Sequence, residues 1–422
     1  MAAGLTAFRS AALRYSIAAG GPVATAGAHF LLTFALLRAL SPAEFGAFSF
    51  LFILAQFSWG IWSALFCAPL PVVLQREGDR PGGAIEAIFA TNLIAAAATL
   101  LPFFGTALLL KLSSGTAALF ALYGSAALVR WFARSYSYAT GRPVVALASD
   151  AAYCGVLFIA TGALMAGRAR NPSIVYAALA AGSLAGLLPF GLSFLKRQLS
   201  LRWRGIAGYR SVWRQYSRWS ILGVLTTEVT GNAHAYLVTI IYGPAAFSIV
   251  AATSLLSRPV GVVMNGLTEF ERARMAQAIA REPASEPLRL VTRFRGLLAA
   301  SWIGNALLAA LVLIAVPRLV FPETYALRDI WLGSSFWFLV AAARAARMAD
   351  SVFLQAAGEF RPLATASLLS AAVSLVSVIA FGVMGGVLWS IAGVFLGELV
   401  YAALIWRAFS RWKHSNNTPV PS

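Results

Sequence analysis

Twelve apolar runs, each long enough to cross a bilayer as a helix, fill most of this chain. They predict membrane-spanning helices at roughly 16–40, 45–67, 84–110, 116–138, 144–167, 173–195, 219–241, 245–268, 296–317, 327–351, 362–384 and 387–408. Of the 422 residues, 59% are hydrophobic and only 11% are charged, whereas about a quarter of the residues in a soluble domain are charged. The sequence therefore predicts an all-α, polytopic membrane protein with about 12 transmembrane helices in two six-helix bundles.

A basic stretch separates the two sets of six runs. Seven Lys or Arg residues and no acid lie between Lys196 and Arg218. Its second half places aromatic and apolar residues on one helical face and arginines on the other: Tyr209, Val212, Trp213, Tyr216 and Trp219 against Arg210, Arg214 and Arg218. A helix of this kind can lie along anionic lipids, and a solvated basic loop explains the same residues.

We therefore expect four parts in the chain. They are an N-terminal six-helix bundle at 1–195, a basic cytoplasmic amphipathic hinge at 196–218 that contacts anionic membrane lipids, a C-terminal six-helix bundle at 219–408, and a basic, disordered cytoplasmic tail at 409–422.

The distribution of positive charge predicts the orientation in the membrane. Placing the N-terminus in the cytoplasm puts about 22 of the 33 Lys and Arg residues in cytoplasmic segments and about six on the other side. Because cytoplasmic loops carry the excess of Lys and Arg, both termini are expected in the cytoplasm. The net charge of +18 is spread over these short loops, so we do not expect nucleic acid as a partner.

Two pairs of matching segments indicate that the halves are repeats. Residues 41–45 (SPAEF) correspond to residues 243–247 (GPAAF), and an apolar run follows each. Arg130 and Arg347 each precede, by eleven residues, a glycine that is followed by a proline. Corresponding helices run in the same direction across the bilayer. The pattern therefore predicts a parallel repeat, which in transporters surrounds a cavity that opens to one face at a time.

These segments also carry a family resemblance. The sequence ALLRALSPAEFGAFSFLF at 35–52, the two sets of six helices, and the fourth and tenth helices that end in a glycine and then a proline resemble the polysaccharide-transporter branch of the MOP flippase superfamily. This branch contains the Wzx-type lipid-linked oligosaccharide flippases, and MATE exporters belong to the same superfamily. The resemblance covers the whole chain.

The resemblance implies a transporter of the bacterial inner membrane. Its substrate would be a polyprenyl-diphosphate-linked oligosaccharide for O-antigen, capsule or exopolysaccharide biosynthesis, flipped by alternating access around an arginine-lined central cavity. The alternative is a MATE-like, ion-coupled exporter of small molecules, which we expect to line its cavity with acids because its substrates are cationic.

The sequence contains no motif of a catalytic site. HExxH, GxSxG and Walker motifs are absent, and no loop between the runs is long enough to hold an active site. Cys67 and Cys154 both lie in apolar runs, which indicates neither a disulfide framework nor a metal cluster. We expect a protein that is not an enzyme and that has no cofactor and no metal site.

Charged residues inside the predicted spans are the candidates for substrate binding, because charge within a bilayer is costly. Five arginines fall there: Arg130, Arg134, Arg258, Arg344 and Arg347. A guanidinium group can bind phosphate through two parallel hydrogen bonds, so these residues are expected to bind the diphosphate. Pairing with buried acids is the alternative role, and the available acids are Asp150, Glu228, Asp350 and Glu398.

A second polar patch lies in the predicted seventh span. Glu228, Asn232 and His234 follow one another there, and we expect them to bind the proton or sodium ion that couples transport. Hydrogen bonding between packed helices explains the same residues. His29, the one histidine of the first span, is expected to be a core residue.

Overall fold

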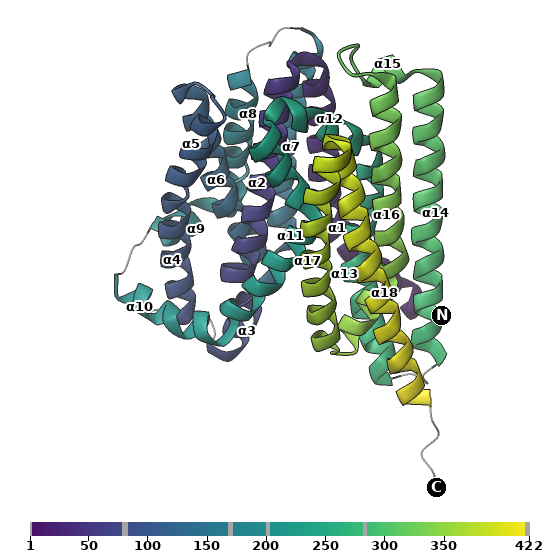
Figure 1. Cartoon of the computed structure of the whole chain (residues 1–422). Coiled ribbons are helices and arrows are strands. Elements are labelled where there is room, and N and C mark those ends of the chain that lie inside the picture. The colour runs from purple at the N-terminus through teal and green to yellow at the C-terminus, as the bar shows by residue number, and fades with distance from the viewer. Residues whose placement is uncertain (1, 78–82, 168–171, 200–202, 282–284, 418–422) are drawn as a thin grey trace. The chain divides into compact units, whose positions relative to one another are not determined.

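The computed structural model describes residues 2–77, 83–167, 172–199, 203–281 and 285–417. Within these ranges every regular element is a helix (Figure 1). The all-α prediction is therefore confirmed.

The helices before the basic stretch follow the six predicted runs. They are α1 Ala2–Ala39, α2 Pro42–Trp62, the π-helical turn η1 Ser63–Cys67, α3 Leu70–Glu77, α4 Ala84–Ala98, α5 Leu100–Leu109, α6 Ser114–Ala139, α7 Pro143–Met165, α8 Pro172–Ala185, the 3₁₀ turn η2 Leu188–Phe190 and α9 Gly191–Leu199. The basic stretch continues as α10 Trp203–Val212 and the π-helical turn η3 Trp213–Ser217.

The remaining helices follow the other six runs. They are α11 Arg218–Tyr242, α12 Pro244–Ser254, the 3₁₀ turn η4 Leu255–Ser257, α13 Arg258–Arg281, α14 Ser285–Ala315, the short α15 Pro317–Val320, α16 Leu327–Ala356, α17 Phe360–Gly385, the 3₁₀ turn η5 Val387–Trp389 and α18 Ser390–Asn417.

Ten helical stretches of the described chain are long and apolar enough to cross a membrane. The two predicted spans outside this set correspond to α11 and α16, which are 25 and 30 residues long. Both have sufficient length, but α11 carries Glu228 and α16 carries Arg344 and Arg347. Because charged residues within spanning helices mark functional sites, α11 and α16 carry candidate site residues.

Helices α6 and α16 end with the same backbone geometry. Gly141 and Gly358 have left-handed φ values of 72° and 79°. The N–H of the residue after each glycine donates to a carbonyl five residues earlier, at 2.7 Å after α6 and 2.9 Å after α16. This is the bond typical of a glycine-terminated helix. The shared ending agrees with the predicted repeat.

The chain forms two compact units whose boundaries differ from the predicted bundles at 1–195 and 219–408. The first unit contains Met1–Leu40 and Leu51–Leu225, and the second contains Ser41–Phe50 and Thr226–Ser422. The basic stretch thus belongs to the first unit, and the start of α2 belongs to the second. Side-chain contacts explain both assignments.

The basic stretch is held to the first unit by packing and hydrogen bonds. Val212 is buried, and α10 packs along α4. The hydroxyls of Tyr209 and Ser217 both donate to the carbonyl oxygen of Leu65, at 2.7 and 2.8 Å. Residues 203–217 are therefore anchored on the first unit, while Arg210 and Arg214 stay exposed.

The start of α2 packs against the matched repeat segment at 243–247, which belongs to the second unit. Ser41 and Glu44 form a capping box in which the Glu44 carboxylate accepts from the Ser41 N–H at 2.9 Å. Gly46 lies so close to the carbonyl oxygen of Pro244 that any Cβ would overlap it. The ring of Phe50 meets that of Tyr236 edge to face, with centroids 5.8 Å apart. The two matched segments therefore pack against each other.

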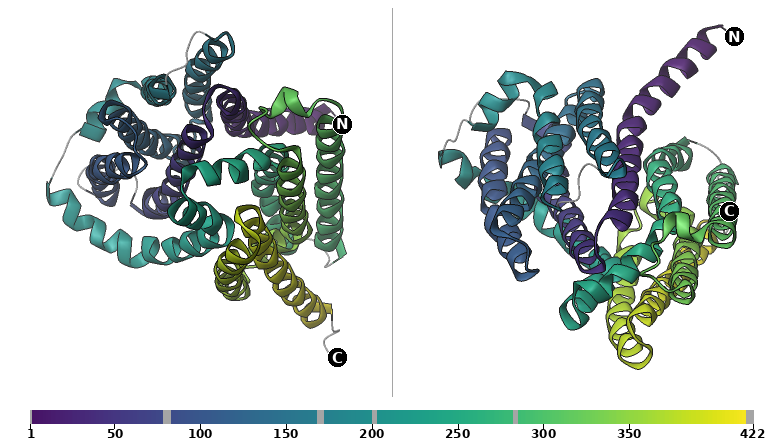
Figure 2. Two further views of the ribbon diagram at one scale, coloured as in Figure 1. Left: turned by 45° about the horizontal axis from the view of Figure 1, so that its top comes forward. Right: turned by 90° about the horizontal axis from the view of Figure 1, so that it is seen from above.

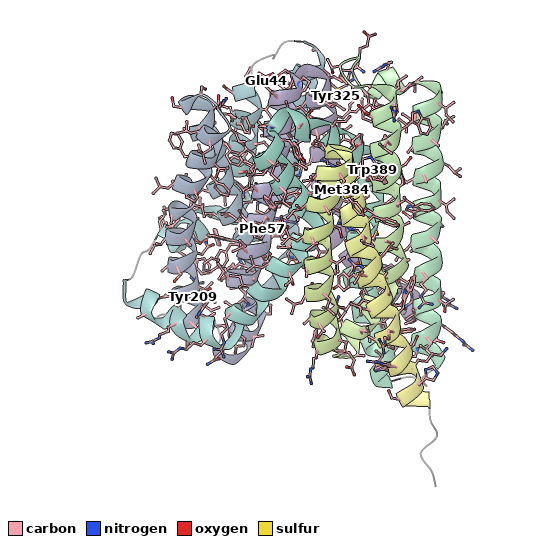
Figure 3. The ribbon with its side chains drawn as sticks, in the orientation of Figure 1. Glu44, Phe57, Tyr209, Tyr325, Met384 and Trp389 are labelled. Atoms are coloured by element: carbon pink, nitrogen blue, oxygen red, sulfur yellow. The ribbon has the colours of Figure 1, made fainter. Side chains whose placement is uncertain are left out.

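Close helix packing and exposed apolar surface both occur in the second unit. Helices α17 and α18 lie side by side in both views (Figures 1 and 2). At Gly397 of α18 a Cβ would lie 2.6 Å from that of Ser374, so only glycine allows this approach. Met384, near the end of α17, is 84% exposed (Figure 3). An exposed apolar side chain of this kind suits contact with lipid.

Candidate functional site

Two arginines of α6 share one carboxylate of α7 inside the first unit. Asp150 accepts a hydrogen bond from Arg130, and it pairs with the Nε of Arg134 at 2.8 Å. The second carboxylate oxygen accepts from a terminal nitrogen of Arg134 at 2.9 Å. The side chains of Arg130, Arg134 and Asp150 are 7%, 9% and 1% exposed. We call these three residues the first arginine cluster.

Neighbouring residues enclose the first arginine cluster. The Nε of Arg130 donates to the Ser149 hydroxyl at 3.1 Å, and its guanidinium carbon lies 4.3 Å from the ring centroid of Tyr153. A side chain at Gly21 of α1 would overlap the Asp150 carboxylate, and one at Gly186 would collide with Arg130. The two glycines therefore let the backbone approach the charged groups.

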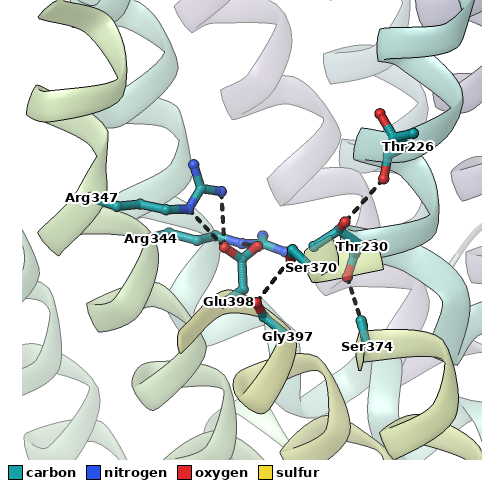
Figure 4. Close-up of polar contacts among 8 residues, drawn as sticks. All are labelled: Thr226, Thr230, Arg344, Arg347, Ser370, Ser374, Gly397 and Glu398. Carbon is teal, nitrogen blue, oxygen red and sulfur yellow. Dashed lines mark hydrogen bonds and ion pairs between the residues drawn. The ribbon is translucent and has the colours of Figure 1, made fainter. Parts of the chain in front are cut away.

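The second unit contains a matching cluster between α16 and α18. Arg344 donates through its Nε to one carboxylate oxygen of Glu398 at 2.7 Å. Arg347 donates through its Nε and a terminal nitrogen to the other oxygen at 3.0 and 2.9 Å (Figure 4). The guanidinium carbon of Arg347 lies 3.9 Å from the ring centroid of Tyr401. We call Arg344, Arg347 and Glu398 the second arginine cluster.

A seam of hydroxyl groups lies beside the second arginine cluster. The hydroxyl of Ser374 donates to the Thr230 carbonyl at 3.1 Å, and that of Ser370 donates to the Gly397 carbonyl at 2.9 Å (Figure 4). These bonds connect α17 to α11 and to α18. They fix the helix that carries Glu398 and so fix the position of its carboxylate.

The two arginine clusters have the same charge, and each consists of two arginines and one acid. In each, two guanidinium groups share a single carboxylate, so one positive charge remains uncompensated among the residues described. In each, a tyrosine three residues after the acid lies against an arginine: Tyr153 after Asp150 and Tyr401 after Glu398. Buried charge is expensive unless it is paired, so the excess charge requires a functional explanation.

Exposure separates the two arginine clusters. Both arginines of the first cluster are below 10% exposed, whereas the Arg344 side chain is 34% exposed and that of Arg347 is 13% exposed. The carboxylate of Glu398, at 2% exposed, is covered from solvent. Arg344 is therefore the member of the two clusters that a ligand reaches most easily.

The fifth predicted arginine and one of the candidate acids lie elsewhere. Arg258 is half-buried as the first residue of α13 and belongs to neither arginine cluster. Asp350, a candidate partner for Arg347, instead pairs with Arg295 of α14 at 2.5 Å. Arg344 and Arg347 both pair with Glu398 of α18, whereas Asp350, one turn after Arg347, reaches the guanidinium group of Arg295 on α14. The structure thus pairs Asp350 with Arg295 and not with Arg347.

The predicted polar patch of α11 divides into two environments. The Glu228 carboxylate accepts from the Asn232 amide at 3.0 Å and from the Tyr236 hydroxyl at 2.5 Å. These three residues are spaced by four and lie on one face. His234 is buried on another face, where its ring meets Trp337 edge to face with centroids 5.0 Å apart. The patch is therefore Glu228, Asn232 and Tyr236, without His234.

His29 is buried in the first unit, as expected of a core residue. Its Nε2 lies 2.7 Å from the Tyr153 hydroxyl, and its ring meets Phe52 edge to face with centroids 4.8 Å apart.

Three tyrosines contact the candidate site residues and were not predicted from the sequence: Tyr153, Tyr236 and Tyr401. The acid-x-x-Tyr spacing at 150–153 and 398–401, and the four-residue spacing from Glu228 to Tyr236, would have indicated them.

No family model matches this sequence, and no curated protein matches it. Solved structures do match its fold. The lipid II flippase MurJ in an inward closed conformation has a TM-score of 0.66 at 12% identity, covering 94% of this chain and 87% of that one. A point mutant of the Vibrio cholerae MATE transporter VcmN has a TM-score of 0.64 at 14% identity, covering 98% of this chain and 99% of that one.

An inward-facing multidrug resistance MATE family transporter of the MOP superfamily has a TM-score of 0.65 at 12% identity, covering 95% of this chain and 99% of that one. All three likenesses span nearly the whole chain. At these identities they establish the fold. The chain is thus a multi-pass membrane protein with the helical fold that MurJ and the MATE transporters share.

Proposed function

We propose that this protein is a membrane transporter that flips a polyprenyl-diphosphate-linked oligosaccharide across the bacterial inner membrane during surface polysaccharide biosynthesis, with both termini in the cytoplasm. The observation that carries this proposal is the second arginine cluster, in which Arg344 and Arg347 share one buried acid. Its excess positive charge suits an anionic substrate. The fold shared with a lipid II flippase supports a lipid-linked substrate.

The geometry at Arg344 suits a phosphate group. Glu398 engages this arginine through its Nε, and within the described chain its terminal nitrogens donate no hydrogen bond. One of them lies beside Gly231 of α11, where an added Cβ would come within 3.4 Å of it. The terminal N–H groups are thus available to bind a diphosphate oxygen pair. Arg347 supplies further positive charge behind them.

The first arginine cluster has a different proposed role. Its arginines are covered by Tyr153 and by the close backbone at Gly21 and Gly186, so they support the first unit and contribute long-range positive potential. The parallel repeat provides the two halves that alternate between faces during transport. Substrate contact is therefore assigned to Arg344 and Arg347, and structural support to Arg130 and Arg134.

Glu228 is proposed to bind the coupling ion. It is a half-buried carboxylate that accepts hydrogen bonds from Asn232 and Tyr236, and among the described residues it forms no ion pair. A carboxylate with neutral partners can take up a proton or a sodium ion at little structural cost. Glu228→Gln should therefore reduce transport while leaving binding of the lipid-linked substrate intact.

The test is a binding and transport comparison of two matched variants of α16. Arg344→Gln removes a charge from the cluster, and Arg328→Gln removes one from an exposed position at the start of the same helix. In nanodiscs, Arg344→Gln should bind undecaprenyl-diphosphate-linked oligosaccharide about 10-fold more weakly, since a charge-assisted hydrogen bond contributes about 1.5–3 kcal/mol. Arg328→Gln should bind as the wild type does. Equal binding by both variants would reject the site.

A MATE-like cation exporter is the second candidate, and the acid at Glu228 together with the fold of VcmN favours it. The two functions differ in what they transport. Proteoliposomes that take up a cationic dye in response to a proton or sodium gradient, with loss of uptake in Glu228→Gln and not in Arg344→Gln, would establish the exporter. Transport of the diphosphate-linked glycan that is lost in Arg344→Gln as well as in Glu228→Gln would establish the flippase.

A further inference from the structure

The last turns of α18 present a basic face that the transport mechanism does not use. Arg407, Ser410, Arg411 and His414 line one shallow hollow of about 690 Å³. Their spacing of three, four and seven residues places them on one face of the helix. All four are exposed, and the His414 Nδ1 lies 2.7 Å from the Ser410 carbonyl oxygen.

A second hollow of about 360 Å³ adjoins the first at Ser410. Its walls come from three helices of the second unit: Arg295 of α14, Ala346 of α16, and Trp406, Phe409 and Ser410 of α18. Arg295 is 44% exposed and pairs on its inner side with the buried Asp350. The indole N–H of Trp406 donates to the Ala346 carbonyl at 3.2 Å. The two hollows together form one surface across α14, α16 and α18.

This surface is positively charged. The charge of Arg295 is balanced by Asp350. Arg407 and Arg411 have no ion pair with any acid of the described chain. They lie one turn apart, so their two charges act on the same point. An anion bound between them would be attracted by both guanidinium groups without displacing an existing pair.

An apolar stripe leads along α18 to the basic face. Leu396, Leu399 and Trp406 are each about 40% exposed. Their spacing of three and seven residues places them along one side of the helix, and Arg407 follows Leu396 by eleven residues, which is about three turns along the same side. Apolar surface followed by two arginines and an interfacial tryptophan matches a phospholipid, whose acyl chain is apolar and whose headgroup carries phosphate. A free phosphate ion would use the basic end alone.

We propose that this surface binds one anionic phospholipid, with the headgroup phosphate at Arg407 and Arg411 and an acyl chain along Leu396 and Leu399. The site is distinct from the second arginine cluster, and no member of that cluster lines either hollow. It also differs from the basic stretch at 196–218, which belongs to the first unit. The occupant is a lipid of the surrounding membrane rather than the transported substrate.

Native mass spectrometry of the full-length protein in detergent tests this site with phosphatidylglycerol and phosphatidylcholine as probes. We expect saturable binding of one phosphatidylglycerol that Arg407→Gln/Arg411→Gln weakens at least 10-fold, with phosphatidylcholine binding unchanged. Inorganic phosphate alone should not bind. Ser410→Trp, which places a bulky side chain where the two hollows meet and keeps every charge, should also weaken phosphatidylglycerol binding.

The matched control removes the same charge from the same end of the second unit. Arg361 lies at the start of α17, and Arg293 lies near the start of α14, two residues before Arg295 and so on another face of that helix; both are exposed. Arg361→Gln/Arg293→Gln should bind phosphatidylglycerol as the wild type does. If this control loses as much binding as the test variant, or if neither the test variant nor Ser410→Trp loses any, the site is refuted. Size-exclusion profiles establish that each variant is folded.

Discussion

The ring of Tyr401 lies 3.9 Å from the guanidinium carbon of Arg347, in the second unit. Tyr153 covers Arg130 in the same way at 4.3 Å in the first unit. Because each tyrosine follows its acid by three residues, one turn of α18 or of α7 presents both a carboxylate and an aromatic ring to the arginines. A guanidinium group over a ring is stabilised by the negative π-face. The acid-x-x-Tyr turn is therefore the shared element of the two arginine clusters.

Tyr401 gives the first prediction. Tyr401→Leu should lower thermal stability in detergent by about 1 kcal/mol because the cation–π contact is lost, whereas Tyr401→Phe should stay close to the wild type because the ring remains. Thermal unfolding followed by circular dichroism measures both. An equal loss in the two variants would mean that the hydroxyl, and not the ring, holds Arg347.

Removal of the shared acid gives the second prediction. Glu398→Gln leaves Arg344 and Arg347 facing each other without a carboxylate, and breaking a buried pair costs about 3–5 kcal/mol. We expect a marked fall in melting temperature and in the yield of monodisperse protein. Glu323→Gln, at an exposed position of the same unit, is the matched control and should be neutral. Similar behaviour of the two variants would contradict the pairing.

The partner of Asp350 gives the third prediction. Double-mutant cycles should give a coupling energy of about 1 kcal/mol or more for Arg295 with Asp350, since they are in contact at 2.5 Å. Arg347 and Asp350 should be additive, so Asp350→Asn should not rescue Arg347→Ala. Unfolding free energies of the single and double variants decide this. Rescue would show that Asp350 is the partner of Arg347.

The contact between the two repeat segments gives the fourth prediction. Gly46→Ala should destabilise the protein because the new methyl group would overlap the Pro244 carbonyl oxygen. Gly27→Ala in α1 has no atom within 4 Å of the new Cβ, and alanine is favoured over glycine in a helix by about 1 kcal/mol. It should therefore stabilise the protein. Opposite signs in the two melting temperatures are the expected result.

Orientation gives the fifth prediction. A reporter of membrane side fused after Gly141 should read as cytoplasmic, and one fused after Lys111 as external. The reason is that Lys and Arg are concentrated in the loops on the side of the membrane that the first fusion reports. Alkaline phosphatase and fluorescent-protein activities report the two sides. Both fusions on one side would show that α6 does not cross the membrane.

Local properties of the sequence predicted the helices well. Run length and hydropathy placed ten spans, and the helices α11 and α16 lie where the remaining two runs predicted them. The glycines that end α6 and α16 were also predictable, because a positive φ is a local requirement of the backbone. The resemblance predicted the helical fold that this chain shares with MurJ and the MATE transporters.

The pairing of charged side chains was decided by the tertiary structure. In the first arginine cluster, the acid Asp150 lies on α7, the helix that directly follows the arginine-bearing α6. In the second cluster, the acid Glu398 lies on α18 and not on α17, the helix that directly follows α16. Asp350 pairs with Arg295 of α14, whereas Arg347, three residues earlier on α16, pairs with Glu398 of α18. Sequence spacing gives the face of a helix. Which helix packs against that face depends on long-range contacts, such as the close approach at Gly397. No local sequence pattern contains these contacts.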